Sequence, residues 1–413
     1  MFQKHKVLLS AYACEPNRGS EPGVGWNWAI EIAKRGHDVV VLTRKNNREV
    51  IESNENTPFN LNFIYYDLPS SLMWLKKVFG VQLYYFLWQI GACFFVKKQS
   101  KYLQLDFIHH ITFVAIRKYS FLSLLDVPFY YGPLGGGESC PNYLLKNESV
   151  KNKTKEFVRN SLNRLLRVNR LSNTMFSRAR KIFATTEQSA YYINRKFKNK
   201  ISIFPAIGIS VDSPKNRIHN ESNSPIRLLY VGHFIYWKGV QICLDALQLI
   251  DEKGVDFKLT LVGKGDEEEI LKNKIKNKKL EAHVEWINWI PQNELTEVYT
   301  QNDLFLFPSL HDSGGMVVLE AMSLGLPIVC FDIGGPGYFV NEQVGSKITV
   351  LSKTYDEVVA DYADEIIKLS NNRELLKAKS GNASQFVSEY SWCNTIDKVY
   401  SIIENDFNSI VKE

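Results

Sequence analysis

The chain has 413 residues, of which 45% are hydrophobic and 23% charged, and its formal net charge is +6. A chain of this length and composition can bury a substantial core, and its length favours two domains over one. Aromatic residues make up 13% of the sequence, which excludes an intrinsically disordered chain. The six cysteines lie far apart without a CxxC pair, so we expect reduced thiols in a cytoplasmic protein and no zinc site.

Short, β-rich apolar segments alternate with helical patterns along the chain, which predicts βαβ units with parallel strands. A helix over 24–35 follows the first strand, and Gly36 closes it. We therefore predict an α/β fold with two doubly wound, Rossmann-like domains that face each other across a cleft. In the first half the expected strands are 7–11, 39–43, 62–66, 107–112, 129–132, 181–185 and 201–204.

A polar, turn-forming stretch at 210–224 separates this half from a second alternating pattern. We expect an N-terminal domain over 1–210, a C-terminal domain over 226–390, and a C-terminal helix over 391–413 that packs back toward the N-terminal domain. In the second half the expected strands are 227–231, 258–262, 284–286, 304–307 and 328–331.

The most informative segment is 305–322, FLFPSLHDSGGMVVLEAM, in which a buried strand leads into a loop and then into a helix. Open α/β sheets bind ligands in such loops at the carboxyl ends of their strands. Gly314 and Gly315 let a ligand approach the backbone closely. The first amides of the helix, which begins at Met316, can then donate to phosphate or sugar oxygens.

The same segment carries two acids, Asp312 and Glu320, eight positions apart. Ionised carboxylates are strong acceptors for paired hydroxyls, so one can bind a transferred sugar and the other a ribose diol. The alternative is an ordinary strand-loop-helix corner in which Asp312 caps the helix.

The pattern of an acid, seven residues and a glutamate in PSLHDSGGMVVLEAMSLGLPIV resembles the E-x7-E motif of family 4 glycosyltransferases, which have the GT-B fold. Asp312 stands in place of the first glutamate, and the following Gly334-Gly335-Pro336 also fits the family pattern. The resemblance extends over nearly the whole chain, through SAYACEPNRGSEPGVGWNWA, DFIHHITF, YGPLGGG, VGHFIYWKG and LVGKGDEEE.

This resemblance implies a retaining glycosyltransferase that moves a sugar from a nucleotide-sugar donor to a glycan or lipid-linked acceptor. The setting that it implies is polysaccharide or lipopolysaccharide assembly. The 1–210 domain would then be the acceptor side, and the 226–390 domain would bind the donor. Two alternatives remain: a catalytically weak GT-B-like nucleotide-sugar-binding or scaffold protein, and a sugar-nucleotide epimerase.

The segment 230–239 resembles the part of the family in which an arginine and a lysine, five positions apart, clamp the donor diphosphate. Lys238 fits this pattern, and fixed cations there would stabilise the charge that develops on the leaving diphosphate. His233 stands where the family has arginine, and a histidine lacks both the permanent charge and the guanidinium fork. Either a nearby phosphate keeps His233 charged or Lys238 carries most of the charge. The alternative for Lys238 is a solvated lysine at a helix start.

In the first half, Gly23 and Gly25 belong to a glycine loop between the first strand and the first helix. Such a loop is either a plain turn or a phosphate site, and the resemblance implies that it faces the donor. His109 and His110 end another strand with side chains on opposite faces, so one of them would reach the cleft and the other would pack in the core. The resemblance implies that the histidine that reaches the cleft contacts the donor sugar. A further glycine loop at 131–137 is expected on the acceptor side.

No DxD motif occurs, so we expect a metal-independent, hexosyltransferase-type enzyme without a cofactor, in which Lys238 and the helix amides replace a divalent cation. We expect no nucleic-acid partner either, because no recognition motif accompanies the positive charge.

Two segments suggest peripheral contact with a membrane. The apolar, aromatic-rich run 78–96 is long enough to span a bilayer. It sits between strands of one Rossmann-like domain, which a spanning helix would disrupt, so we expect an interfacial or a buried helix instead. The segment 151–181 contains ten basic residues and a single acid. We expect contact with anionic lipid at the inner face of the cell membrane through 151–181, with 78–96 as a second candidate. On a helical wheel the apolar side of 151–181 comprises Val158, Leu162, Leu165, Leu166 and Phe176.

Overall fold

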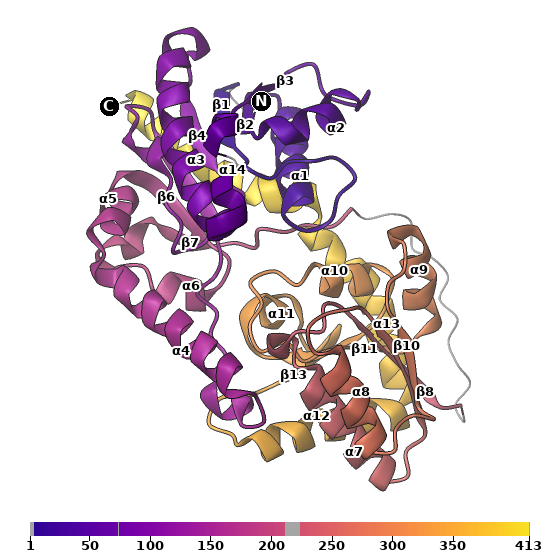
Figure 1. The fold of residues 1–413 in the computed structure, drawn as a ribbon. Helices are drawn as coiled ribbons and strands as arrows, with labels where there is room; N and C mark the ends of the chain where they lie inside the picture. The colour runs from indigo at the N-terminus through magenta and orange to yellow at the C-terminus, as the bar shows by residue number, and fades with distance from the viewer. Residues whose placement is uncertain (1–3, 73, 211–223, 413) are drawn as a thin grey trace. The chain divides into compact units, whose positions relative to one another are not determined.

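The computed structural model describes residues 4–72, 74–210 and 224–412. Figure 1 shows two parallel β-sheets, each flanked by helices. This confirms the predicted fold class, α/β with two Rossmann-like sheets. The chain divides into two compact units. The first comprises Met1–Gly137, Ser161–Gly208 and Trp392–Glu413, and the second comprises Glu138–Asn160 and Ile209–Ser391.

The first unit contains a seven-stranded parallel sheet in the order β3-β2-β1-β4-β5-β6-β7. The central strands are apolar and buried on both faces because helices cover the sheet on both sides. All seven predicted strands are present, with each end within two residues of its expected position. They are β1 (Lys6–Ser10), β2 (Asp38–Thr43), β3 (Leu61–Tyr65), β4 (Phe107–His110), β5 (Phe129–Leu134), β6 (Ala179–Ala184) and β7 (Ile201–Ile203).

The longer helices of this unit include α1 (Ser20–Lys34), α3 (Trp74–Leu103) and α5 (Arg170–Arg178). Helix α3 contains the apolar run 78–96 and is kinked at Gly80, whose φ is 79°. No helix in the described part of the chain is long and apolar enough to cross a bilayer. The buried face of α3 packs into the core of the unit through Tyr84, Tyr85, Trp88, Ala92 and Val96.

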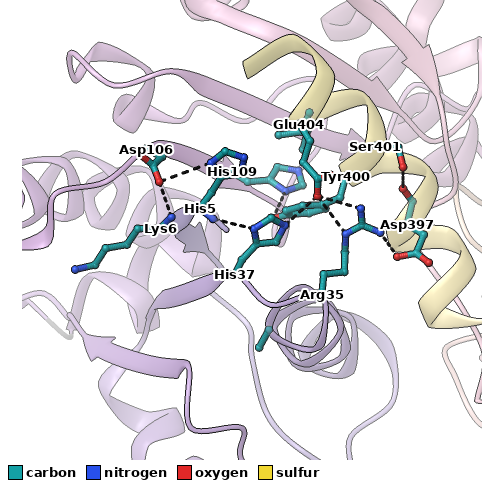
Figure 2. Close-up of polar contacts among 12 residues, drawn as sticks. His5, Lys6, Arg35, His37, Asp106, His109, Asp397, Tyr400, Ser401 and Glu404 are labelled. Atoms are coloured by element: carbon teal, nitrogen blue, oxygen red, sulfur yellow. Dashed lines mark hydrogen bonds and ion pairs between the residues drawn. The ribbon is translucent and has the colours of Figure 1, made fainter. Parts of the chain in front are cut away.

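The C-terminal helix α14 (Trp392–Lys412) packs in the first unit, beside α1. Figure 2 shows Arg35 pointing toward Asp397 and Glu404 of this helix. The Arg35 Nη2 to Glu404 Oε1 distance is 3.0 Å, and the Nε2 of His37 lies 3.0 Å from the same oxygen. A buried ionic network therefore fastens the end of the chain to the unit that contains its beginning.

The second unit contains a six-stranded parallel sheet in the order β10-β9-β8-β11-β12-β13. The five predicted strands are present as β8 (Ile226–Val231), β9 (Phe257–Val262), β10 (Val284–Ile287), β11 (Leu304–Phe307) and β12 (Ile328–Phe331). The sixth, β13 (Gly345–Ile348), was not predicted because its sequence GSKI is short and largely polar. The longer helices here include α7 (Val240–Glu252), α9 (Gln292–Gln301), α10 (Met316–Ser323), α12 (Tyr355–Asn371) and α13 (Arg373–Phe386).

The division of the chain differs from the expected domain limits in one respect. Residues 138–160 cluster with the second unit, although the sequence placed them in an N-terminal domain over 1–210. This segment includes the first part of α4 (Val150–Leu165), whose buried Glu156 bonds to side chains of the second unit. Most of the expected boundary at 210–224 lies outside the described residues.

Candidate functional site

The second sheet reverses its strand order between the neighbouring strands β8 and β11. In open α/β folds, ligands bind beyond the carboxyl ends of the strands at such a switch point. The loop after β8 carries Lys238, and the loop after β11 carries Asp312. Because the two strands are parallel neighbours, both loops leave the same edge of the sheet.

Lys238 and Asp312 form an ion pair through Nζ and Oδ2. Their side chains remain 17% and 18% exposed, so an incoming anion or hydroxyl can reach them. The other carboxylate oxygen of Asp312 accepts from the amide of Gly314 at 3.2 Å, and the lysine ammonium lies 5.0 Å from the ring centroid of Phe307. The structure thus brings the predicted cation and the predicted acid together in one place.

Helix α10 begins next to this pair. Its N-cap is Gly315, whose φ of 87° favours glycine, and no side chain caps the helix. Asp312 bonds to the amide of Gly314, not to a helix amide, so the capping alternative does not describe this corner. The first amides of α10, beginning at Met316, are therefore available to an anionic ligand, and the positive end of the helix dipole favours one.

The turn after β12 holds this loop in place from the other side. The amide of Gly335 donates to the carbonyl of Asp312 at 2.7 Å. A Cβ on Gly335 would lie 2.3 Å from the carbonyl oxygen of Gly314, and one on Gly334 would lie equally close to that of Asp312. Side chains cannot fit at such distances, which explains why two glycines occur here.

Glu320 lies farther along α10, and the hydroxyl of Tyr299 on α9 donates to its carboxylate at 3.4 Å. Burial raises the pKa of Glu320 above its ordinary value. His233 is exposed in the loop after β8, and among the described residues its imidazole makes no hydrogen bond or ion pair. Its carbonyl oxygen accepts from the hydroxyl of Tyr230 at 3.2 Å.

Four residues next to the Lys238 and Asp312 pair were not predicted. The Oε1 atom of Glu156 accepts from the Tyr236 hydroxyl at 2.8 Å and from His311 Nε2 at 2.9 Å. Trp237 stacks on His311, with ring centroids 5.4 Å apart. One signal could have identified Glu156, because it is the only acid in the strongly basic segment 151–181.

The structure corrects the prediction that one of His109 and His110 faces an open cleft, because both side chains are fully buried. His109 donates to the carbonyl of Gly132 at 2.8 Å and accepts from the hydroxyl of Tyr400 on α14 at 3.3 Å. On the other face of the sheet, His110 lies 3.1 Å from the Tyr85 hydroxyl of α3. Burial lowers the pKa of each histidine to about 3, so both are neutral parts of the core.

The structure gives Gly23 and Gly25 a packing role, and their expected contact with a donor stays a prediction. Both glycines are buried within the first turns of α1. A Cβ on Gly23 would lie 1.9 Å from the carbonyl oxygen of Arg18, and one on Gly25 would lie 2.1 Å from that of Ala13. These glycines allow the helix to pack against the loop after β1. Over the described ranges, no group of three or more His, Cys, Asp or Glu side chains is arranged to hold a metal ion.

Comparison with known proteins finds a family model that matches within the second unit and relatives that match about a third of the chain. Residues 212–386 match the family model of glycosyl transferases group 1. An uncharacterized glycosyltransferase of Haemophilus influenzae is 35% identical over 153 residues, which are 37% of this chain and 42% of that protein. The amylovoran biosynthesis glycosyltransferase AmsK of Erwinia amylovora is 30% identical over 135 residues, or 31% of this chain and 33% of that protein. The chain thus matches less than half of the length of either relative.

Solved structures resemble the chain over nearly its full length. Sucrose-phosphate synthase from Thermosynechococcus elongatus has a TM-score of 0.64 and 16% identity, with 98% of this chain and 100% of that chain covered. The Anabaena protein HepE, solved in complex with UDP, has a TM-score of 0.61 and 16% identity, with coverages of 97% and 99%. These likenesses show that the chain has the same fold as those proteins, the GT-B fold.

Proposed function

We propose that the protein is a retaining, metal-independent glycosyltransferase. It transfers a sugar, of the hexose class, from a nucleotide-sugar donor to a glycan or lipid-linked acceptor in polysaccharide or lipopolysaccharide assembly. The observation that carries this proposal is the meeting of Lys238, Asp312 and the uncapped start of α10 at the switch point of the second sheet. The match of residues 212–386 to glycosyl transferases group 1 and the role of AmsK in amylovoran biosynthesis support it.

The chemistry of the site follows from its charges. A donor diphosphate would draw the ammonium of Lys238 away from Asp312 and would accept from the first amides of α10. As the glycosidic bond breaks, negative charge grows on the diphosphate, and these preorganised donors stabilise it more strongly than they stabilise the ground state. Asp312, released from the lysine, would then accept from hydroxyls of the sugar, and Glu320 from the ribose diol.

Retention of anomeric configuration requires no protein nucleophile in this scheme. The leaving phosphate oxygen would accept the proton of the acceptor hydroxyl on the face from which the phosphate departs. The acceptor oxygen would form its bond to the anomeric carbon on that same face, so the product keeps the configuration of the donor. This role suits a site whose fixed groups are a lysine and backbone amides.

The proposal includes contact with an anionic membrane through helix α4 and the residues after it. Phe157 and Leu165 of α4 are 71% and 60% exposed, and basic side chains lie around them. Exposed apolar groups among cations are typical of helices that lie in a lipid interface. The predicted apolar side needs one correction, because Leu166 and Phe176 are buried in the core of the first unit and cannot reach lipid.

A donor screen followed by variants tests the enzymatic proposal. UDP, GDP, ADP and their hexoses are added to the protein, and the matching nucleotide raises the melting temperature because it binds the folded state. Turnover of the best donor is then expected to fall by about 10²–10³-fold in Lys238→Ala and in Glu320→Gln. NMR of the product anomer tests retention, and EDTA tests metal independence. Tight nucleotide binding without any turnover would instead support the scaffold alternative, and no binding by any nucleotide would refute both.

Sedimentation with vesicles tests membrane contact. Vesicles with about a third anionic lipid should pellet the protein, and vesicles of neutral lipid should not. Phe157→Asp is expected to abolish pelleting, whereas Phe59→Asp, which changes an exposed phenylalanine of the first unit, should leave it unchanged. Equal pelleting of both variants would refute the role of α4.

A further inference from the structure

Glu156 is unusual among the acids of the chain. It is the only acid in the basic segment 151–181, yet its side chain is 1% exposed. An ionised carboxylate is stable in the interior only where hydrogen bonds and charges compensate for the loss of water. Its partners therefore indicate what the buried carboxylate does.

Both of its hydrogen-bond donors come from the loops of the candidate site. Tyr236 precedes Lys238 by two residues in the loop after β8, and His311 directly precedes Asp312 in the loop after β11. One oxygen of Glu156 accepts from both, at 2.8 and 2.9 Å. A single atom of α4 thus connects the segments that carry the two members of the ion pair.

The contacts around this carboxylate leave the two loops little freedom. Trp237 stacks on His311 with an angle of 13° between the rings, and its carbonyl oxygen accepts from the amide of Leu310 at 2.7 Å. The guanidinium of Arg159, one turn along α4, lies 3.6 Å from the second carboxylate oxygen of Glu156. Burial acts to raise the pKa of Glu156, but the bonds from His311 and Tyr236 and the charge of Arg159 outweigh it, so the pKa lies below its usual value.

We propose that Glu156 is a positioning residue of the donor site. By binding Tyr236 and His311 it fixes where Lys238 and Asp312 meet, without touching the substrate itself. This inference rests on the proposed function, because the position of Lys238 matters only if it binds a diphosphate. Small displacements of a group that acts on a reacting centre reduce rates strongly, so loss of the carboxylate should be felt in binding and turnover.

The test measures the effect of Glu156→Gln in the wild-type protein and in the Lys238→Ala variant. The ligand is whichever of UDP, GDP and ADP binds the wild type most tightly. Glutamine keeps the shape of the side chain but removes its charge. In the wild-type background we expect the affinity for the diphosphate, measured by calorimetry, to fall about tenfold. In the Lys238→Ala background the same substitution should change the affinity by less than about twofold, because the positioned cation is absent.

A merely structural role gives a different pattern. A loop that had become less stable would weaken binding equally in both backgrounds. Equal losses of affinity would therefore overturn the inference. An unchanged affinity in the single variant Glu156→Gln would overturn it as well. Glu365→Gln is the matched control. Glu365 is a partly buried, hydrogen-bonded glutamate, but its partners Ser346 and Lys368 lie outside the two loops. If the wild type binds none of the three diphosphates, the proposed function itself fails. If it binds one and the two backgrounds behave alike, only the role of Glu156 fails.

Discussion

The two sheets have equivalent switch points, and the chain uses them differently. In the first unit the amide of Ala13, after β1, donates to Thr112 Oγ1, after β4, at 3.1 Å. The amide of Phe113 donates at 3.0 Å to the carboxylate of Glu21, an exposed residue in the first turn of α1. In the second unit the loops after β8 and β11 meet through Lys238 and Asp312, which stay partly exposed. The same topology is therefore joined by hydrogen bonds to backbone amides in one unit and by a side-chain ion pair in the other.

The ionisable groups follow the same division. His109 and His110 are buried, and both ring nitrogens of His109 and the Nε2 atom of His110 bond to groups of their own unit. Under the proposed function, Lys238 exchanges Asp312 for the donor diphosphate. Substitutions in the first unit should consequently change the free energy of unfolding, and substitutions in the second should change ligand binding.

Arg35→Ala should have the largest effect on stability. It removes the cation that faces Asp397 and Glu404, and it leaves a buried Glu404 with a poorer set of partners. Breaking a buried pair from one side costs about 3–5 kcal/mol of unfolding free energy. Denaturant unfolding measures this loss, and calorimetry should show unchanged nucleotide affinity in the molecules that remain folded. Lys34→Ala, which removes an exposed partner of Glu31, should cost less than about 1 kcal/mol. A drop in nucleotide affinity in Arg35→Ala would contradict the division between the units.

Gly335→Ala should disturb the candidate site without removing any of its functional groups. The added Cβ would press on the carbonyl of Gly314 and displace the loop that carries Asp312. We expect at least a tenfold loss of nucleoside-diphosphate affinity, together with about 1–3 kcal/mol of stability. Gly381→Ala is the control, because a Cβ there meets nothing within 4 Å and should be neutral or stabilising. Wild-type affinity in Gly335→Ala would show that the loop position does not govern binding.

The buried histidines predict a pH dependence of stability. The pKa of His110 is about 3 in the folded protein and 6.5 when the chain is unfolded, so between these values the unfolded chain binds a proton that the folded one does not. Stability should therefore fall as the pH decreases from 6.5 toward 3, by up to about 1.4 kcal/mol per pH unit for this residue. His110→Gln should lower that slope by about this amount in urea unfolding at pH 7, 6 and 5. Identical slopes for the two proteins would show that His110 is protonated in the fold.

His233→Arg should have the smallest effect, and in the favourable direction. Arginine carries a permanent charge and a donor fork, and the exposed side chain of residue 233 has room for it. We expect a gain of about three- to tenfold in nucleoside-diphosphate affinity, measured by calorimetry. Asn382→Arg, which adds the same charge at an exposed position on α13, is the control. Equal gains in both variants would mean that only net charge matters.

The strands and the loop after β11 could be predicted from sequence because their signals are local. Apolar runs of strand length, with glycines and an acid at the end of one of them, indicate the loop that carries Asp312. The burial of the His109 side chain could not be predicted, because it involves Tyr400, which is 291 residues away in the sequence. The same holds for Glu156, whose partners Tyr236 and His311 follow it by 80 and 155 residues. Local patterns do not report which distant side chains will meet.

The return of α14 to the first unit has a consequence for the order in which the protein matures. During synthesis the stretch 209–391, which contains the whole second sheet, leaves the ribosome before residues 392–413 do. Until then Arg35 and His37 lack Glu404, and His109 lacks Tyr400. The unit that is begun first is therefore the one completed last, and a nascent chain that stops short of residue 392 would present its unfinished face to chaperones and proteases.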